Sequence, residues 1–390
     1  MRNKALVVLF FTIFMDLMGF GLIIPILPIY AKELGATDAM VGLLGTSFSI
    51  MQFIFASFWG GLSDRYGRRP IILISIAIMT VAYLLFANAT VLWLLFATRM
   101  LKGFGAANLS VAQAYISDVV PKEKRTKAFG IIGAAFGLGF IFGPSIGGLI
   151  NEYHGVSGVG YFAAGLSLIN LVLAYFFLGE TLQERAKSIA LFPNPFKDII
   201  RFRSSSEISS LFTINFVYVL GFSMMQITST LLWSEHFGLS ELHIGYTFAY
   251  IGFLAVVIQG GLIGYFNTWF GERNLLFFGT LLVAIGLFSM PFVPTDRFYL
   301  ELVSMTLLSF GNALLTPTVS SLLTAYAPED AQGKVLGTNQ SVGSLARVLG
   351  PAIGGAVYGL HFTYPYVLAG SITLVVSVLA IRLRKRIYST

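Results

Sequence analysis

The sequence predicts an all-α integral membrane protein with twelve transmembrane helices, arranged as two pseudo-symmetric six-helix bundles. Three observations support this prediction. Hydrophobic residues make up 56% of the 390 residues and charged residues only 11%, which is far from the composition of a soluble chain. Long apolar runs alternate with short polar loops along the whole sequence. A pattern of glycines in the first half returns in the second half, which indicates a duplicated unit.

Each apolar run can cross the hydrocarbon core of a bilayer, which needs about 20 helical residues. The runs of the first half cover residues 6–30, 40–60, 70–89, 91–118, 128–150 and 159–179. Those of the second half cover residues 208–232, 243–265, 274–293, 299–326, 334–359 and 364–382. The first run is followed by no small-residue cleavage site, so we expect it to remain as the first span.

The segment between the halves, residues 180–207, is basic and contains the helix-breaking sequence PNP at 193–195. It is predicted to be a cytoplasmic linker that joins a six-helix bundle at 1–179 to a second bundle at 208–390. Lysines and arginines gather in this linker, at both chain ends and in alternate loops, whereas the opposite loops carry only Lys32 and Arg297. Positive charge favours the cytoplasmic side, so both termini are predicted to lie in the cytoplasm, with the protein in the plasma membrane.

The net charge of +7 is therefore interpreted as a topology signal, and no nucleic-acid partner is expected. The chain has no cysteine, which excludes a disulfide framework and a thiol site.

The glycine repeat is densest in residues 130–148, where glycines recur every three or four positions along one helix face. Small residues allow helices in lipid to pack backbone to backbone. Gly137 and Gly143 are therefore expected to lie against a neighbouring helix of the second half. A second copy follows at a constant offset: Gly350, Pro351, Gly354 and Gly355 repeat Gly143, Pro144, Gly147 and Gly148. Two six-helix halves on one chain are typical of transporters whose substrate site lies between the halves, near the membrane midplane.

Several motifs resemble those of a known family. Residues 60–70, GGLSDRYGRRP, resemble the signature loop of the major facilitator superfamily. The fourth run contains RMLKGFGAANLS and ends in YISDVVPKEKR, similar to the arginine–glycine pattern and the charged end of the corresponding superfamily helix. The first run, MDLMGFGLIIPILPIY, resembles the tetracycline-exporter-like branch. The fifth run resembles the antiporter motif of drug:proton antiporters, here Gly133, Gly137, Gly143, Pro144, Gly147 and Gly148. The resemblance implies a monomer driven by the proton gradient, without a cofactor.

The signature loop implies a cytoplasmic gate. Its members are Gly61, Asp64, Arg65, Gly67, Arg68, Arg69 and Asp118. Asp64 is expected just before the third helix, where the positive end of the helix dipole favours a carboxylate. Asp118 is expected to face the basic loop 122–127. In the second half Thr268 takes the position of Asp64, so the gate is predicted to be asymmetric.

Two charges fall near the middle of predicted spans. Asp16 should lie roughly 16 Å deep in the first helix, at a rise of 1.5 Å per residue, and Arg99 should reach a comparable depth from the outer end of the fourth. A charge at that depth costs at least ~2.5–3.5 kcal/mol, so both are expected to face a cavity or each other. In the functional interpretation, Asp16 binds and releases the coupling proton and Arg99 tunes its affinity. The alternative is an ion pair that only holds the two helices together.

Lys102 and Arg347 are also placed deep in the spans. Asp16 is the only carboxylate assigned to the spans, so three cations would face one anion in the cavity, which favours an anionic or zwitterionic amphiphile as substrate. The alternative is that Lys102 bonds to a backbone carbonyl and that Arg347 bonds to the gate. Further cavity candidates are amides, each of which is equally consistent with a role in helix packing: Gln52, Asn108, Gln113, Asn215, Gln226, Gln259, Asn312 and Asn339.

These features together predict a secondary active transporter: a proton-coupled antiporter that exports amphiphilic small molecules by alternating access. A symporter, a facilitator or a lipid flippase of the same superfamily is the alternative. A membrane receptor or enzyme that transports nothing is disfavoured, because no soluble domain is found. No phosphate-binding loop is found either, so ATP is not the expected energy source. No metal site is expected, since no histidine has the spacing of a metal ligand. Tetracycline is disfavoured as the substrate, because Ala255 and Val283 stand where tetracycline exporters carry intramembrane His and Asp.

Overall fold

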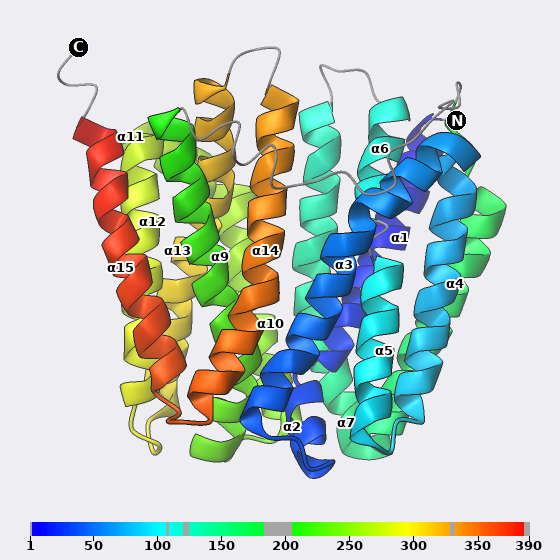
Figure 1. Ribbon diagram of the computed structural model, residues 1–390, viewed down its shortest axis with the longest axis horizontal. Coiled ribbons are helices and arrows are strands. Elements are labelled where there is room, and N and C mark those ends of the chain that lie inside the picture. Colours follow the sequence, from blue (N-terminus) through cyan, green and yellow to red (C-terminus); the bar gives the residue numbers. More distant parts are fainter. Residues whose placement is uncertain (1, 107–108, 120–124, 183–204, 328–331, 386–390) are drawn as a thin grey trace. The chain divides into compact units, whose positions relative to one another are not determined.

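The computed structural model of the protein describes residues 2–106, 109–119, 125–182, 205–327 and 332–385 (Figure 1). These residues form helices joined by turns, in agreement with the predicted all-α class. The chain divides into two compact units. Unit 1 comprises Met1–Ala36, Ser47–Pro193 and Leu239–Gly252, and unit 2 comprises Thr37–Thr46, Asn194–Gly238 and Phe253–Thr390.

The helices of the first half of the chain follow the predicted apolar runs. They are α1 (Arg2–Ile23), α2 (Leu27–Glu33), α3 (Asp38–Tyr66), α4 (Arg68–Ala87), α5 (Leu92–Gly105), α6 (Leu109–Val119) and α7 (Arg125–Phe177). The break between α1 and α2 contains Pro25, and Pro28 opens α2, where a missing backbone N–H costs least.

The fifth and sixth predicted runs both lie in α7, which comprises two helices that meet at a kink. Its helical geometry is interrupted only at Gly155, whose φ of 64° and ψ of −177° produce a kink. A positive φ is costly for residues with a Cβ, and glycine adopts it freely. The two predicted runs are therefore joined by a kink at Gly155, within the stretch where the loop is expected.

The second half contains two π-helical segments within its spans. Its elements are α9 (Ser206–Leu231), η4 (Leu232–His236), α10 (Glu241–Val257), η5 (Ile258–Leu262), α11 (Ile263–Phe270), α12 (Glu272–Ser289), η6 (Met290–Phe292), α13 (Phe298–Tyr326), α14 (Gln332–Tyr358) and α15 (Tyr364–Lys385). The π-helical segments are η4 and η5, and η6 is a 3₁₀ turn. Single π turns inside α-helices frequently mark functional positions.

Eight helices of the described chain are long and apolar enough to cross a membrane. Three predicted runs are not among these eight helices. Residues 107–108, between α5 and α6, lie outside the described chain, a π segment separates α10 from α11, and α14 covers the run 334–359 as one helix. The all-α membrane fold is thus confirmed, and the number twelve stays a prediction.

The glycine repeat is visible in the packing of each unit. In unit 1, α7 packs along α1, where a Cβ added to Gly143 would lie 2.7 Å from the Met18 carbonyl oxygen and 2.8 Å from the Gly21 Cα. In unit 2, α14 packs along α9 in the same way, and a Cβ added to Gly350 would lie 2.8 Å from the Leu220 carbonyl oxygen. Neither contact leaves room for a side chain.

The neighbour of the α7 stripe differs from the expectation, which placed a helix of the second half against Gly143. Gly139, Gly143 and Gly147 all face α1. A second face of α7, at Pro144 and Gly148, contacts the segment of α10 that belongs to unit 1. Gly137 is half-buried in α7, and the surroundings of Gly133 lie outside the described part of the chain.

Unit 2 repeats this second contact. The short segment Thr37–Thr46, the start of α3, packs with Gly42 against Pro351 and Gly355 of α14. In unit 1, Gly245 of α10 packs against Pro144 in the equivalent way. Each unit therefore includes one helical segment from the opposite half of the sequence, held by a glycine-to-backbone contact.

Candidate functional site

Two buried cations lie on one face of α5 in unit 1. Arg99 is 6% exposed and Lys102 is 4% exposed. The Arg99 guanidinium lies over the Phe48 ring, 4.6 Å from its centroid, and its Nε is buried without a hydrogen-bond partner. The Lys102 ammonium lies 4.3 Å from the centroid of Tyr83 and donates to the Gly19 carbonyl at 3.3 Å. Aromatic faces attract such cations, which offsets part of the cost of burial.

The carboxylate of Asp16 in α1 acts electrostatically on one of these cations, Lys102. The charge of Arg99 also acts on Lys102, so the structure brings together three of the predicted site residues. Asn170 of α7 holds Asp16 in place: its Nδ2 donates to Asp16 Oδ1 at 3.0 Å and to the Thr12 carbonyl at 3.2 Å. We name Asp16, Arg99, Lys102 and Asn170 the charged cluster.

Asn170 was absent from the predicted site, although a signal was present in the sequence. It is an amide in the middle of the apolar run 159–179, and it is 1% exposed. Buried polar groups are almost always hydrogen-bonded, so an isolated amide in a span indicates a polar neighbour on another helix. The bond between Lys102 and the Gly19 carbonyl matches the structural alternative that was considered for that lysine.

The remaining predicted cavity residues fall in different places. In unit 1, Gln52 donates to the Ala106 carbonyl at 3.3 Å. Asn108 and the side chain of Gln113 lie outside the described part of the chain. Gln226 is half-buried in α9, and Gln259 is exposed in η5.

Unit 2 contains a polar cluster of its own around Tyr218 of α9. The Tyr218 hydroxyl donates to Asn312 Oδ1 and lies 3.5 Å from the Thr316 hydroxyl. Asn215 donates to the Asn339 carbonyl at 3.3 Å. Arg347 of α14 is exposed in the described chain and donates to Ser344, one turn earlier, at 3.1 Å. Arg347 and Asp16 belong to different units, so a cavity shared by both stays a prediction.

A second carboxylate lies inside a predicted span, which corrects the assignment of Asp16 as the only one. Glu301 lies in the first turn of α13 and is 0% exposed. Its Oε1 accepts a hydrogen bond from Trp233 Nε1 at 2.8 Å. Sequence analysis overlooked it because it lies close to the end of its apolar run, where a polar residue is expected.

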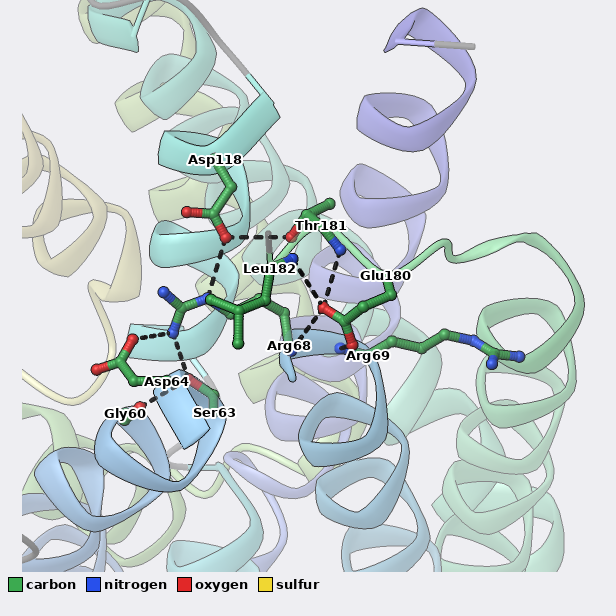
Figure 2. Close-up of polar contacts among 9 residues, drawn as sticks. All are labelled: Gly60, Ser63, Asp64, Arg68, Arg69, Asp118, Glu180, Thr181 and Leu182. Carbon is green, nitrogen blue, oxygen red and sulfur yellow. Dashed lines mark hydrogen bonds and ion pairs between the residues drawn. The ribbon is translucent and has the colours of Figure 1, made fainter. Parts of the chain in front are cut away.

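The predicted gate residues meet at Arg68, which begins α4 (Figure 2). Its Nη1 forms an ion pair with Asp64 at 2.5 Å and donates to Ser63 at 2.6 Å. Its Nε lies 3.1 Å from Asp118 of α6. Only 7% of Arg68 is exposed, so one buried guanidinium joins the ends of α3, α4 and α6.

The carboxylate at the start of α4 is Glu180 and not the expected Asp64, which lies in the last turn of α3. Glu180 follows α7 and accepts four backbone hydrogen bonds (Figure 2). The donors are the amides of Arg68 (2.9 Å), Arg69 (3.2 Å), Thr181 (2.8 Å) and Leu182 (3.0 Å). Two of these amides are the otherwise unpaired N–H groups of a helix start, which attract anions.

These bonds set the protonation of Glu180. Burial raises the pKa of its carboxyl, but the four backbone hydrogen bonds lower it further than burial raises it, and the resulting pKa lies below the ordinary value. Gly67 makes the approach possible: it has a φ of 111°, and a Cβ there would collide with the Glu180 carboxylate. The carboxylate is therefore built into the turn between α3 and α4.

The other predicted gate residues between α3 and α4 make fewer contacts than Arg68. Arg69 donates to the Tyr175 carbonyl at 2.6 Å, Arg65 is exposed beside Tyr66, and Gly61 lies in α3 near its end. The side chains of the basic loop 122–127, expected opposite Asp118, lie outside the described part of the chain.

In the described part of unit 2, no carboxylate forms an ion pair with the arginine of the equivalent loop, and Glu272, the first residue of α12, accepts a hydrogen bond from Ser321 at 2.5 Å. Thr268 donates to the Tyr265 carbonyl within its own helix at 2.8 Å. Arg273, the counterpart of Arg68, donates to the Tyr326 hydroxyl at 3.0 Å. A neutral phenol thus takes the place of Asp118. The two loops differ in charge, as the sequence predicts.

An all-helical membrane fold with an internal repeat, a buried charged cluster in one unit and an arginine-centred loop between α3 and α4 defines the class of secondary transporters. The sequence profile of the Major Facilitator Superfamily matches residues 9–296 and 211–390. The chain belongs to this superfamily.

Known proteins of this superfamily are similar over most of their length. The tetracycline resistance protein of class C from Escherichia coli is 31% identical, over 91% of this chain and 90% of that protein. Multidrug resistance protein 2 of Bacillus subtilis is 30% identical, over 96% of this chain and 94% of its own. Among solved structures, that of the human organic anion transporter MFSD10 (TETRAN) superimposes with a TM-score of 0.75 at 25% identity, over 97% of this chain and 99% of that one.

Proposed function

We propose that the protein is a proton-coupled antiporter that exports amphiphilic small molecules from the cell. The observation that supports this most directly is the charged cluster: a carboxylate, Asp16, held by Asn170 beside two buried cations. Ionisable groups inside membrane helices are functional by default. The drug-resistance relatives favour export. The energy source is the proton gradient, with no cofactor, and the protein acts as a monomer without enzymatic activity.

The charges of the cluster constrain the substrate. In an antiporter the substrate must bind better when Asp16 is ionised, so that it displaces the proton. A zwitterion meets this requirement, because its cationic group replaces the proton at Asp16 while its anionic group pairs with one of the cations of the protein. The organic anion transporter among the structural relatives supports an anionic group on the substrate.

A symporter is the second candidate function, and the charged cluster is also consistent with it. A purely anionic substrate binds best when Asp16 is neutral, since two cations then remain without a carboxylate. Binding would then take up a proton. A facilitator or a lipid flippase would bind its substrate without either change. Proton release, proton uptake or no change on substrate binding to the purified protein separates these functions.

The network around Arg68 is proposed to close the cytoplasmic side, with both termini in the cytoplasm of the plasma membrane. In this role Arg68 fixes the ends of α3, α4 and α6 to one another while the substrate site is open to the outside. The four backbone hydrogen bonds of Glu180 attach the end of α7 to the same point.

The decisive experiment is Asp16→Asn. The amide keeps the shape of the carboxyl and removes its titration, so transport driven by a pH gradient in proteoliposomes should fall to background while the protein remains folded. The substrate is chosen by thermal stabilisation of the purified protein, since a ligand that binds the native state raises its stability. The matched control is Asp296→Asn, in an exposed surface pair with Arg297, which should leave transport intact. Undiminished gradient-driven transport by Asp16→Asn would contradict the proposal.

A further inference from the structure

Glu301 of unit 2 is a carboxyl group that the function described so far does not use. It is fully buried near the start of α13. Trp233 of η4, itself 0% exposed, donates to Oε1 at 2.8 Å. Oε2 is also buried, and it has no hydrogen-bond partner in the described part of the chain.

No lysine or arginine among the described residues forms an ion pair with Glu301. Arg297, one turn before it, is exposed and pairs with Asp296. Towards α12, the contacts of α13 include a bond between the uncharged hydroxyls of Ser289 and Ser304. The groups around Glu301 therefore supply no positive charge.

The titratable neighbours of Glu301 are neutral or acidic. Tyr366 of α15 is 0% exposed, and Glu301 and Glu235 act on it electrostatically. Glu235 of η4 is exposed and accepts a hydrogen bond from Tyr358 of α14 at 3.1 Å. Asp38 acts on Tyr358. His236 of η4, three residues after Trp233, stacks on Phe362.

An ionised carboxylate without a cation is very costly in an apolar interior, and such a group binds a proton instead. We propose that Glu301 is a second proton-binding site of the transporter, occupied while α13 is closed to water. Two features allow the proton to leave when water enters. Glu301 lies in the first turn of α13, where the helix dipole favours the anion, and the Trp233 N–H already bonds to one carboxyl oxygen. Proton binding by Glu301 is inferred from the structure of unit 2 alone. A role of this proton in coupled transport rests on the proposed antiport.

Trp233 supplies a direct probe, because its indole N–H bonds to the group that titrates. The three other tryptophans are replaced by Trp59→Phe, Trp93→Phe and Trp269→Phe, which leaves Trp233 as the only tryptophan of the chain. Emission is recorded as a function of pH in the purified full-length protein. We expect one titration step in this parent and its loss in Glu301→Gln, where the hydrogen bond is kept and the charge is not. The matched control is Glu235→Gln, which should retain the step.

A flat titration in the parent, or an unchanged step in Glu301→Gln, would overturn the proposal. If the tryptophan replacements prevent folding, infrared spectroscopy of the otherwise unchanged chain gives the same answer. The carbonyl band of a buried carboxylic acid should be present in the parent and reduced in Glu301→Gln, and an identical band in both would contradict the assignment. Neither measurement involves transport, so its result is independent of the outcome of Asp16→Asn.

Discussion

At the scale of single residues, Glu180 shows how one carboxylate can order a loop from a distance in sequence. It lies after α7, yet its four hydrogen bonds include the first amides of α4. Carboxylates stabilise helix starts by satisfying unpaired N–H groups and by complementing the dipole. The turn between α3 and α4 thus depends on a side chain from another part of the chain.

This arrangement predicts a pH-dependent contribution to stability. The pKa of Glu180 is lowered in the folded protein, so its ionised form stabilises the fold. That contribution is fully present above the ordinary glutamate pKa, and it is lost as the pH falls through the lowered pKa of the folded state. Glu180→Gln should therefore reduce the thermal stability near neutral pH, by a few tenths to about 1 kcal/mol after allowance for solvent screening.

The measurement is the difference in Tm between the parent and Glu180→Gln as a function of pH. The difference should narrow as the pH falls below the ordinary glutamate range. Glu152→Gln, at an exposed position of α7, is the control and should show no such difference. A gap in Tm that does not change with pH would exclude the ionised carboxylate as the stabilising group.

The residue scale also marks the limit of sequence analysis. Asp16, Arg99 and Lys102 could be predicted because charges are rare in apolar runs. Glu180 and Glu301 could not, since a carboxylate near the end of a helix has no unusual local pattern. Their roles depend on contacts with residues far away in the sequence, Arg68 and Trp233, and only the fold brings these together.

At the scale of elements, α7 combines two contrasting glycines. Gly143 lies against the backbone of α1, whereas a Cβ at Gly165 would meet no atom within 4 Å. Both lie in helical parts of the same element. The pair therefore separates the effect of helix contact from the effect of adding a side chain to a glycine position.

Gly143→Val should push α1 and α7 apart, because its Cβ would lie 2.7 Å from the Met18 carbonyl oxygen. Over-packing of this kind typically costs ~1–3 kcal/mol. We expect a lower Tm and impaired transport, with Gly165→Val close to the parent in both assays. Full transport and an unchanged Tm in Gly143→Val would show that the contact does not constrain the two helices.

At the scale of the whole molecule, the internal repeat predicted from glycine spacing is reproduced by helix packing within each unit. Sequence analysis predicted the helical class and the two halves because hydropathy and small-residue spacing are properties of the chain itself. It did not predict that Thr37–Thr46 and Leu239–Gly252 would join the opposite unit. That assignment depends on which backbones meet at Gly42 and Gly245, and spacing alone does not identify the partner.

The prediction that the substrate has an anionic group follows from the charges of the molecule. The unit 2 cation Arg347 is exposed in the described chain and is proposed to take the anionic group of the substrate. Arg347→Ala should weaken binding of an anionic amphiphile, anilinonaphthalene sulfonate, about tenfold, or ~1.4 kcal/mol. Binding of the cation ethidium should be unchanged. Both are measured by fluorescence titration of the purified protein.

The matched control for this experiment is Arg297→Ala, which removes an exposed cation outside the helices. It should affect neither ligand. Tighter binding of ethidium than of the sulfonate, together with unchanged sulfonate binding in Arg347→Ala, would refute the preference for an anionic group.

The two contacts of α7 with α1 have a consequence for how a proton is exchanged. In the part of α7 before the kink at Gly155, Gly143 packs against Gly21 of α1. In the part after the kink, Asn170 donates a hydrogen bond to Asp16. With α1 held at both places, Asp16 keeps the same neighbours in every state in which these helices move together. In the proposed antiport, the carboxyl group would then stay between these two contacts, and its protonation would change with the arrival of water or substrate.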